Sequence, residues 1–234
     1  MVKIKAIFLD VDNTLLDFNQ MKRLCVKSAV DAMLDAGLDI PRKKAIKQVF
    51  EVYDAEGIEY KNVLQDFLKN ALGKIDYRIL AKGVIAYRKM RDGILMPYPE
   101  VKSTIIKLKK KGFKIAILSD AQNYQLWMRL CATGIDDLSD VVVSAEDVGA
   151  EKPNPKIFQL AMKKLKVKPE ECLMVGDMPG RDIKGAKDLL IKSVLVMYGS
   201  ENISKNYVKD MTIKPDFKIN YFRELLPLIS KLNS

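Results

Sequence analysis

Several short apolar segments of the chain are followed by side chains that could do acid–base, nucleophilic or metal chemistry. These candidate site residues are Asp10, Asp12, Ser119, Lys152, Asp177 and Asp182. If the apolar segments are strands of one parallel sheet, their carboxyl ends meet at one edge, where open α/β sheets bind ligands. The sequence therefore predicts that four carboxylates, one hydroxyl and one ammonium gather in one site.

Four carboxylates in one site repel each other and raise each other's pKa, and a single lysine does not balance their charge. A divalent cation does. The chain contains no histidine, which excludes Ser–His and Cys–His nucleophile systems and histidine-ligated metals. Because all the candidate ligand atoms are oxygens, a hard ion is favoured, most simply Mg²⁺. Magnesium in turn favours a phosphate-bearing substrate, which a carboxylate could attack at phosphorus.

Strands and helices are predicted to alternate along most of the chain. Five short segments are nearly continuous in apolar residues, which is typical of strands buried on both faces of a parallel sheet. They are Ile4–Leu9, Phe113–Leu118, Val141–Ser144, Cys172–Val175 and Ser193–Val196. The helical patterns between the later strands are Pro99–Lys111, Asn123–Thr133, Pro155–Leu165 and Ile183–Leu190. With a short edge strand and a closing helix near the C-terminus, this order predicts an α/β fold with a doubly wound, Rossmann-like parallel sheet.

The interval between the first two predicted strands breaks this alternation. About a hundred residues separate Asp10 from the strand that begins at Phe113, although a crossover needs only about a dozen. Residues 17–92 carry helical patterns separated by breaks that contain glycine. We therefore predict a four-helix insert over residues 17–92 and an α/β core made of residues 1–16 and 93–234.

Four short motifs resemble those of a known superfamily. They are "DVDNT" from Asp10, "LSD" around Ser119, Lys152 in "EKPNP" and "GDMPGRD" around Asp177. In this order they resemble the four motifs of the haloacid dehalogenase (HAD) superfamily, and the resemblance covers nearly the whole chain. The helical insert after the first motif resembles the C1-type cap of that superfamily. The resemblance implies a C1-capped, phosphatase-like hydrolase.

The resemblance also implies a role for each candidate residue. Asp10 is expected to be the nucleophile that forms an aspartyl-phosphate, and Asp12 the general acid and then the base. Ser119 is expected to hydrogen-bond a phosphoryl oxygen, and Lys152 to neutralise charge on Asp10 and the phosphoryl group. The implied Mg²⁺ ligands are Asp10, the backbone carbonyl of Asp12, and Asp177 with or without Asp182.

Asp12 favours a phosphatase over a dehalogenase, because a dehalogenase displaces halide from carbon and typically lacks the second Asp. We expect a Mg²⁺-dependent phosphatase that acts on a small phosphorylated metabolite, with a 2-haloacid dehalogenase-type hydrolase as the alternative. Mutase chemistry and the identity of the phosphate ester stay open. Asp120 stands where relatives often have Asn or Gly, and one interpretation is that it caps the next helix.

The net charge of +10, from 40 Lys and Arg against 30 Asp and Glu, raises a hypothesis of another class. A non-enzymatic basic protein on this fold could bind nucleic acid or a partner. The basic residues are spread along the chain, so we do not favour nucleic-acid binding. No apolar run is long enough to span a bilayer, and the N-terminus lacks the features of a signal peptide, which predicts a cytoplasmic protein. Nothing in the sequence indicates the oligomeric state.

The cysteines Cys25, Cys131 and Cys172 are far apart in the chain and form no CxxC motif. An odd number of widely spaced cysteines does not indicate a disulfide framework or a zinc site. We therefore predict three buried, reduced thiols.

Overall fold

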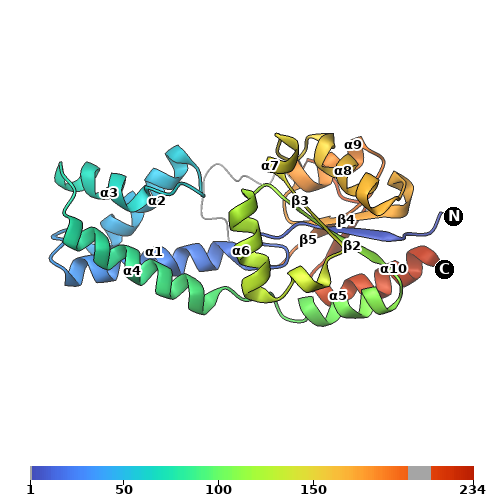
Figure 1. The fold of residues 1–234 in the computed structure, drawn as a ribbon, viewed down its shortest axis with the longest axis horizontal. Helices are drawn as coiled ribbons and strands as arrows, with labels where there is room; N and C mark the ends of the chain where they lie inside the picture. Colours follow the sequence, from blue (N-terminus) through green and yellow to red (C-terminus); the bar gives the residue numbers. More distant parts are fainter. Residues whose placement is uncertain (1, 200–211) are drawn as a thin grey trace. The chain divides into compact units, whose positions relative to one another are not determined.

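The computed structural model describes residues 2–199 and 212–234, and its chain divides into two compact units (Figure 1). Among the described residues, the core unit contains 2–17, 96–199 and 212–234, and the helical unit contains 18–95. Within these described ranges, no helix combines the length and the apolar character that a membrane span requires.

A parallel sheet of six strands forms the centre of the core unit, in the order β3–β2–β1–β4–β5–β6. The strands are β1 (Ala6–Leu9), β2 (Lys114–Ser119), β3 (Val141–Ser144), β4 (Cys172–Gly176), β5 (Lys192–Val196) and β6 (Phe217–Ile219). β1 lies between β2 and β4, with Leu9 opposite Ile117 and Val175. The predicted doubly wound sheet is confirmed, and the short edge strand near the C-terminus is β6.

Helices cover both faces of this sheet (Figure 1). On one face lie α8 (Pro155–Leu165) and α9 (Lys184–Asp188), and on the other lie α5 (Val101–Lys110) and α10 (Leu225–Asn233). Two-sided cover leaves the strand ends as the place where polar side chains can reach a ligand.

The side chains of the central strands alternate between two buried layers. Phe8 of β1 and Met174 of β4 pack with Phe158 of α8 in one hydrophobic cluster. Ile7 points to the opposite face, because successive strand residues alternate, and it is also 0% exposed. Burial on both faces explains why these strands are nearly continuous in apolar residues.

The last predicted helix of the core differs from the structure. Ile183–Leu190 was expected to be one helix, but a π-helical turn, η3 (Pro179–Ile183), comes first and α9 ends at Asp188. Leu190 has a positive φ of 60°, which a helix interior does not allow. A short helix that we did not predict, α7 (Ala145–Val148), follows β3, and the Ser144 hydroxyl caps it.

The helical unit contains α1 (Phe18–Asp35), α2 (Arg42–Glu56), α3 (Val63–Leu72) and α4 (Tyr77–Ile94). α4 thus continues two residues beyond the predicted boundary at residue 92. Gly83 of α4 permits close packing against α1, because a Cβ at this position would collide with the side chain of Met33.

The two connections between the units run side by side where they belong to the core unit. Leu16 pairs with Pro97 in an antiparallel bridge, and the Leu15 carbonyl accepts a hydrogen bond from the Tyr98 backbone N–H at 2.8 Å. Just before them, the Val11 carbonyl accepts from the N–H groups of Leu15 and Leu16. The segment after Asp10 is therefore a tight, hydrogen-bonded loop.

The three cysteines are free thiols, as predicted, but only Cys25 and Cys172 are buried. Cys131 is exposed, which corrects the prediction for that residue. It lies on α6 (Asn123–Thr133), whose buried side is formed by Leu126 and Leu130 among others. Cys131 follows Leu130 by one position, so the helix turns it away from the interior.

Candidate active site

Asp10 directly follows the central strand β1, and its side chain lies at the carboxyl edge of the sheet. Its backbone N–H donates to the Val175 carbonyl at 3.0 Å, which extends the β1–β4 ladder by one residue. Ser119 is the last residue of β2 and Asp177 the first after β4. Because β2 and β4 flank β1, the strand order brings these three residues to one edge.

Lys152 connects two of the candidate carboxylates. Its Nζ atom lies 2.6 Å from Oδ1 of Asp10 and 2.7 Å from Oδ1 of Asp182. It also donates to the Leu118 carbonyl at 3.2 Å, so the three ammonium donors have three acceptors. Lys152 is only 4% exposed, and its charge is therefore compensated inside the protein.

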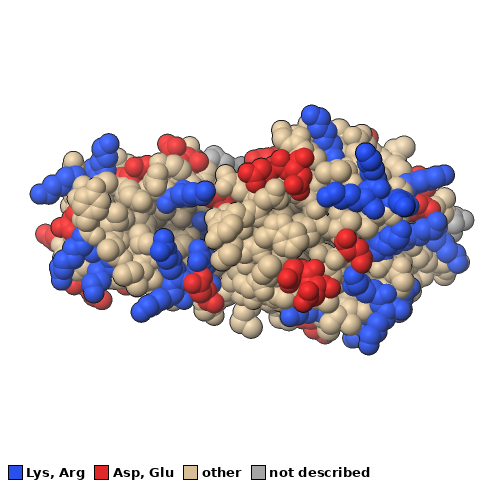
Figure 2. All heavy atoms as spheres, viewed as in Figure 1, with Lys and Arg blue, Asp and Glu red and all other residues tan. Residues whose placement is uncertain are grey.

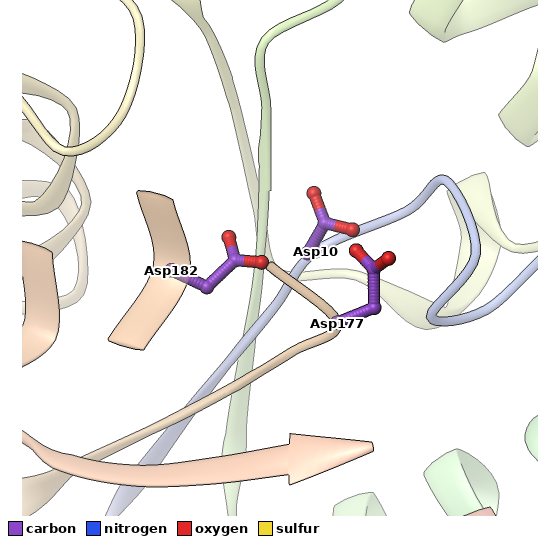
Figure 3. Close-up of side chains that lie close together, drawn as sticks. All are labelled: Asp10, Asp177 and Asp182. Carbon is purple, nitrogen blue, oxygen red and sulfur yellow. The ribbon is translucent and has the colours of Figure 1, made fainter. Parts of the chain in front are cut away.

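Three candidate carboxylates form a group that could hold a cation. Ligand oxygens of Asp10, Asp177 and Asp182 all lie within 4.8 Å of one another, and Figure 3 shows the three side chains around one small region. All three residues are buried. One lysine does not balance three carboxylates, and their oxygens are the ligands that Mg²⁺ prefers. The residues present therefore fit a magnesium ion.

The electrostatics of the cluster favour binding of positive charge. Burial raises the pKa of Asp10, although Lys152 acts against this shift. Burial likewise raises the pKa of Asp182 to about 7, again against Lys152. Burial by itself would lower the pKa of Lys152, but Asp10 and Asp182 hold that pKa well above its usual value. The lysine thus stays charged, but its single positive charge does not offset the negative charge of the carboxylates beside it.

The carboxylate of Asp12 lies in an ion pair with a residue that we did not predict. Nη1 of Arg129 lies 2.6 Å from Oδ2 of Asp12, and the arginine is 6% exposed. Arg129 lies on α6 between Leu126 and Leu130, on the buried side of that helix. A charged residue on the apolar side of a helix was the one sequence signal that could have identified it.

Asp120 does not cap the next helix, which corrects that interpretation. α6 begins at Asn123 after Gln122. The carboxylate of Asp120 instead accepts a hydrogen bond from the Lys152 backbone N–H at 2.8 Å and from Arg181 at 3.0 Å. Asp120 therefore links the segments that carry Lys152 and Asp182, and its charge is compensated by Arg181.

Ser119 is 1% exposed at the end of β2. Its Oγ atom accepts a hydrogen bond from the Ala121 backbone N–H at 3.1 Å. This bond uses a lone pair of the oxygen and not the hydroxyl proton. The arrangement is compatible with a hydroxyl that donates to an anion.

Comparison with known proteins identifies the family. A family model described as a haloacid dehalogenase-like hydrolase matches residues 4–189, well over half of the chain. The chain belongs to the haloacid dehalogenase-like hydrolase family.

Its relatives include enzymes named as phosphatases. The chain is 33% identical over 228 residues to a glyceraldehyde 3-phosphate phosphatase of Methanothermobacter thermautotrophicus, covering 95% of this chain and 100% of the relative. It is 32% identical to one of Methanocaldococcus jannaschii, covering 98% of each. The crystal structure of a HAD phosphatase from Thermococcus onnurineus matches with a TM-score of 0.69 and 25% identity, covering 99% of this chain and 100% of that one.

The prediction of a haloacid dehalogenase-like hydrolase is thus confirmed, and the names of the relatives agree with the predicted phosphoric monoester hydrolase. A non-enzymatic basic binding protein is not supported. On the face drawn in Figure 2, Lys and Arg side chains are spread over both units and interspersed with Asp and Glu. This distribution gives no reason to prefer nucleic acid as a partner.

Proposed function

We propose that this haloacid dehalogenase-like hydrolase is a Mg²⁺-dependent phosphatase that hydrolyses a small phosphorylated metabolite through an aspartyl-phosphate on Asp10. One observation carries the proposal. Asp10, at the end of the central strand, lies 2.6 Å from the buried Lys152 ammonium and belongs to a group of three buried carboxylates. Such a site can hold a cation and a phosphoryl group beside a nucleophile.

In the first half-reaction, a carboxylate oxygen of Asp10 attacks phosphorus, and the bond between phosphorus and the ester oxygen breaks. Asp12 gives its proton to the departing alcohol. Lys152 offsets negative charge on the phosphoryl oxygens, and the Ser119 hydroxyl donates a hydrogen bond to one of them. The products are the free alcohol and the phosphorylated Asp10.

In the second half-reaction, Asp12 takes a proton from a water molecule, whose oxygen attacks phosphorus. The bond between phosphorus and Asp10 breaks, and inorganic phosphate leaves. Asp10 is again a carboxylate and Asp12 again carries a proton. The two carboxylates thus have separate tasks, one as nucleophile and one as proton carrier.

Magnesium would be held by Asp10, the backbone carbonyl of Asp12 and Asp177, with Asp182 as a further ligand or as a support. When bound, the ion supplies positive charge that offsets the carboxylates and the phosphate. Both oxygens of Asp182 already accept hydrogen bonds, from Lys152 and from the Met178 backbone N–H at 3.0 Å. This supports Asp177 as the main direct ligand and Asp182 as the residue that orients Lys152.

The relatives support a small phosphorylated aldehyde as the first substrate to test, because both relatives compared above are named glyceraldehyde 3-phosphate phosphatases. We further propose that the helical insert of residues 17–92 acts as a cap on the core of residues 1–16 and 93–234. Such a cap would exclude water from the reaction and select the substrate.

The experiment compares the chain with its Asp10→Asn variant on glyceraldehyde 3-phosphate and p-nitrophenyl phosphate, with Mg²⁺ and with EDTA. We expect release of inorganic phosphate that requires Mg²⁺ and falls at least about a thousandfold in the variant, while its circular dichroism is unchanged. Retained turnover in the variant would refute the proposal. Transfer of the phosphoryl group to another position of the substrate, without release of phosphate, would indicate a mutase. A further assay uses 2-chloropropionate as substrate, and release of chloride from it would indicate a dehalogenase.

A further inference from the structure

The ion pair between Arg129 and Asp12 has no part in the chemistry described above, yet it involves the proposed proton carrier. The two residues are 117 positions apart in the chain. Only 7% of the Arg129 side chain and 25% of the Asp12 side chain is exposed. An ion pair this well shielded from water is costly to build unless the groups are held in good geometry.

Helix α6 is fixed at both ends, and this fixes Arg129. At its start, the Asn123 backbone N–H donates to Glu146 at 2.8 Å and the Asn123 side chain donates to Asp147 at 3.1 Å. At its end, Lys102 donates to the Thr133 carbonyl at 3.0 Å. The guanidinium therefore extends from an anchored helix and not from a loop.

Asp12, by contrast, lies in the loop after β1, where no strand or helix defines its side-chain direction. A proton carrier must lie within hydrogen-bond reach of the atom it serves, and a misplacement of about 1 Å can cost about a hundredfold in rate. Contact with an anchored guanidinium restricts the carboxylate to one orientation. The contact engages Oδ2 of Asp12.

We propose that Arg129 is a positioning residue for Asp12, which holds the carboxylate in the orientation needed to exchange protons with the leaving group and with water. This inference rests on the proposed function, since it assumes that Asp12 carries the proton. Arg129 acts here through Asp12 and not through contact with the substrate. Its removal should therefore matter only as long as Asp12 is present.

A double-mutant cycle tests this dependence. The variants are Arg129→Met, Asp12→Asn and the two combined, with kcat and KM measured on an alkyl phosphate in the presence of Mg²⁺. We expect Arg129→Met to lower kcat about 10- to 100-fold, with KM changed less than about threefold. In the Asp12→Asn background, the same substitution should change kcat less than about twofold.

Two further variants separate positioning from stability. Arg129→Lys keeps the charge but loses the planar donor group, so it should recover part of the lost kcat. Arg223→Met is a matched control, because Arg223 forms an exposed ion pair with Glu100 at 2.7 Å elsewhere in the core unit. Its kcat should equal that of the unmodified chain.

If Arg129→Met does not fold, Arg129→Lys takes its place in the cycle, and the expected result is the same loss of effect in the Asp12→Asn background. The inference would be overturned if the losses of kcat in the two single variants multiply in the double variant, or if Arg129→Met leaves kcat unchanged. These outcomes differ from failure of the proposed function, in which Asp10→Asn or Asp12→Asn would itself leave turnover intact.

Discussion

At the scale of single residues, Lys152 offsets part of the negative charge of the buried acidic cluster. Its ammonium contacts both Asp10 and Asp182, and 2% of its side chain is exposed. Removal of a buried ionic partner is more damaging than loss of a surface ion pair, because the remaining charges stay buried without compensation. The stability of the core unit should therefore depend on this one ammonium.

We predict that Lys152→Met lowers the free energy of unfolding by about 3–5 kcal/mol at neutral pH in EDTA, and that it also abolishes phosphate release. Urea denaturation measures the first effect. Lys184→Met is the control, since the Lys184–Asp188 pair is about half exposed and is worth at most about 0.5 kcal/mol. Equal stability of the two variants would contradict the prediction.

The raised pKa of Asp182 makes the stability of the metal-free protein depend on pH. Burial raises this pKa from 3.8 to about 7 in the folded state. Between about pH 4 and pH 7 the folded chain therefore keeps a proton on Asp182 that the unfolded chain has released. The stabilisation that this proton gives is complete below the unfolded pKa and is lost as the pH rises through about 7. We predict that thermal unfolding in EDTA shows this loss, and that Asp182→Asn reduces it.

Mg²⁺ should reverse this trend, because a cation bound in the cluster favours the deprotonated form of the carboxylates that hold it or lie beside it. The rise in melting temperature on adding Mg²⁺ should be larger at about pH 8 than at about pH 5. Melting curves with and without Mg²⁺ at both pH values measure it. A rise of the same size at both would argue against carboxylate ligands.

How far the site could be predicted depended on where each residue lies. Asp10, Ser119 and Asp177 each stand at or next to a strand end. The order of strands in a parallel sheet places such residues at one edge, so their location could be predicted from the sequence. Arg129 reaches Asp12 from the middle of a helix, and such a contact follows from tertiary packing. The position of Arg129 on the apolar side of its helix indicates a buried charge, but no local pattern of the sequence indicates Asp12 as its partner.

At the scale of elements, Gly176 at the end of β4 lies directly against a side chain of the π-helical turn η3. A Cβ on Gly176 would collide with the carboxyl group of Asp182, which lies directly against this residue. The last residue of β4 must therefore be glycine if Asp182 is to reach Lys152. Because Gly176 has no Cβ, the end of β4 and the carboxyl group of Asp182 can lie in contact.

We predict that Gly176→Ala displaces Asp182 and weakens Mg²⁺ binding at least about tenfold, as loss of a support for metal ligands commonly does. Titration calorimetry with Mg²⁺ measures it. Gly180→Ala is the control, because a Cβ there meets nothing within 4 Å. Equal Mg²⁺ affinity of both variants would show that Asp182 has no part in the metal site.

The elements themselves were predicted with uneven success, for physical reasons. The five buried strands could be found because two-sided burial leaves continuous apolar runs. The turn at η3 could not be found, since the Asp182 carboxylate accepts from the Met178 N–H and this side-chain bond competes with a regular helix start. Helix α7 was missed because its four residues are too short for an apolar period.

At the scale of the whole molecule, the helical unit is inserted into the core at two adjacent points, marked by the Leu16–Pro97 bridge. A short linker could therefore replace residues 18–95 without moving the ends that it joins. The core retains its sheet and the helices on both faces, so it keeps its own hydrophobic interior.

We predict that a chain with residues 18–95 replaced by a short Gly/Ser linker unfolds cooperatively on its own and binds Mg²⁺. It should still hydrolyse p-nitrophenyl phosphate, but it should discriminate less among phosphorylated metabolites, because the proposed cap is gone. Circular dichroism and a substrate panel measure both. An unfolded product, or unchanged selectivity, would contradict the prediction.

The loop between Asp10 and the insert is bonded to the core at several atoms. The Leu15 carbonyl accepts from the Tyr98 backbone N–H at 2.8 Å, and the Tyr198 hydroxyl donates to the Thr14 carbonyl at 2.7 Å. Any rotation of the helical unit must then be absorbed at Asp17 and around Leu95, where the chain leaves this bonded region. A rotation absorbed there would leave the backbone from Asp10 to Leu16 in place, so substrate entry and product release need not disturb the two proposed catalytic acids.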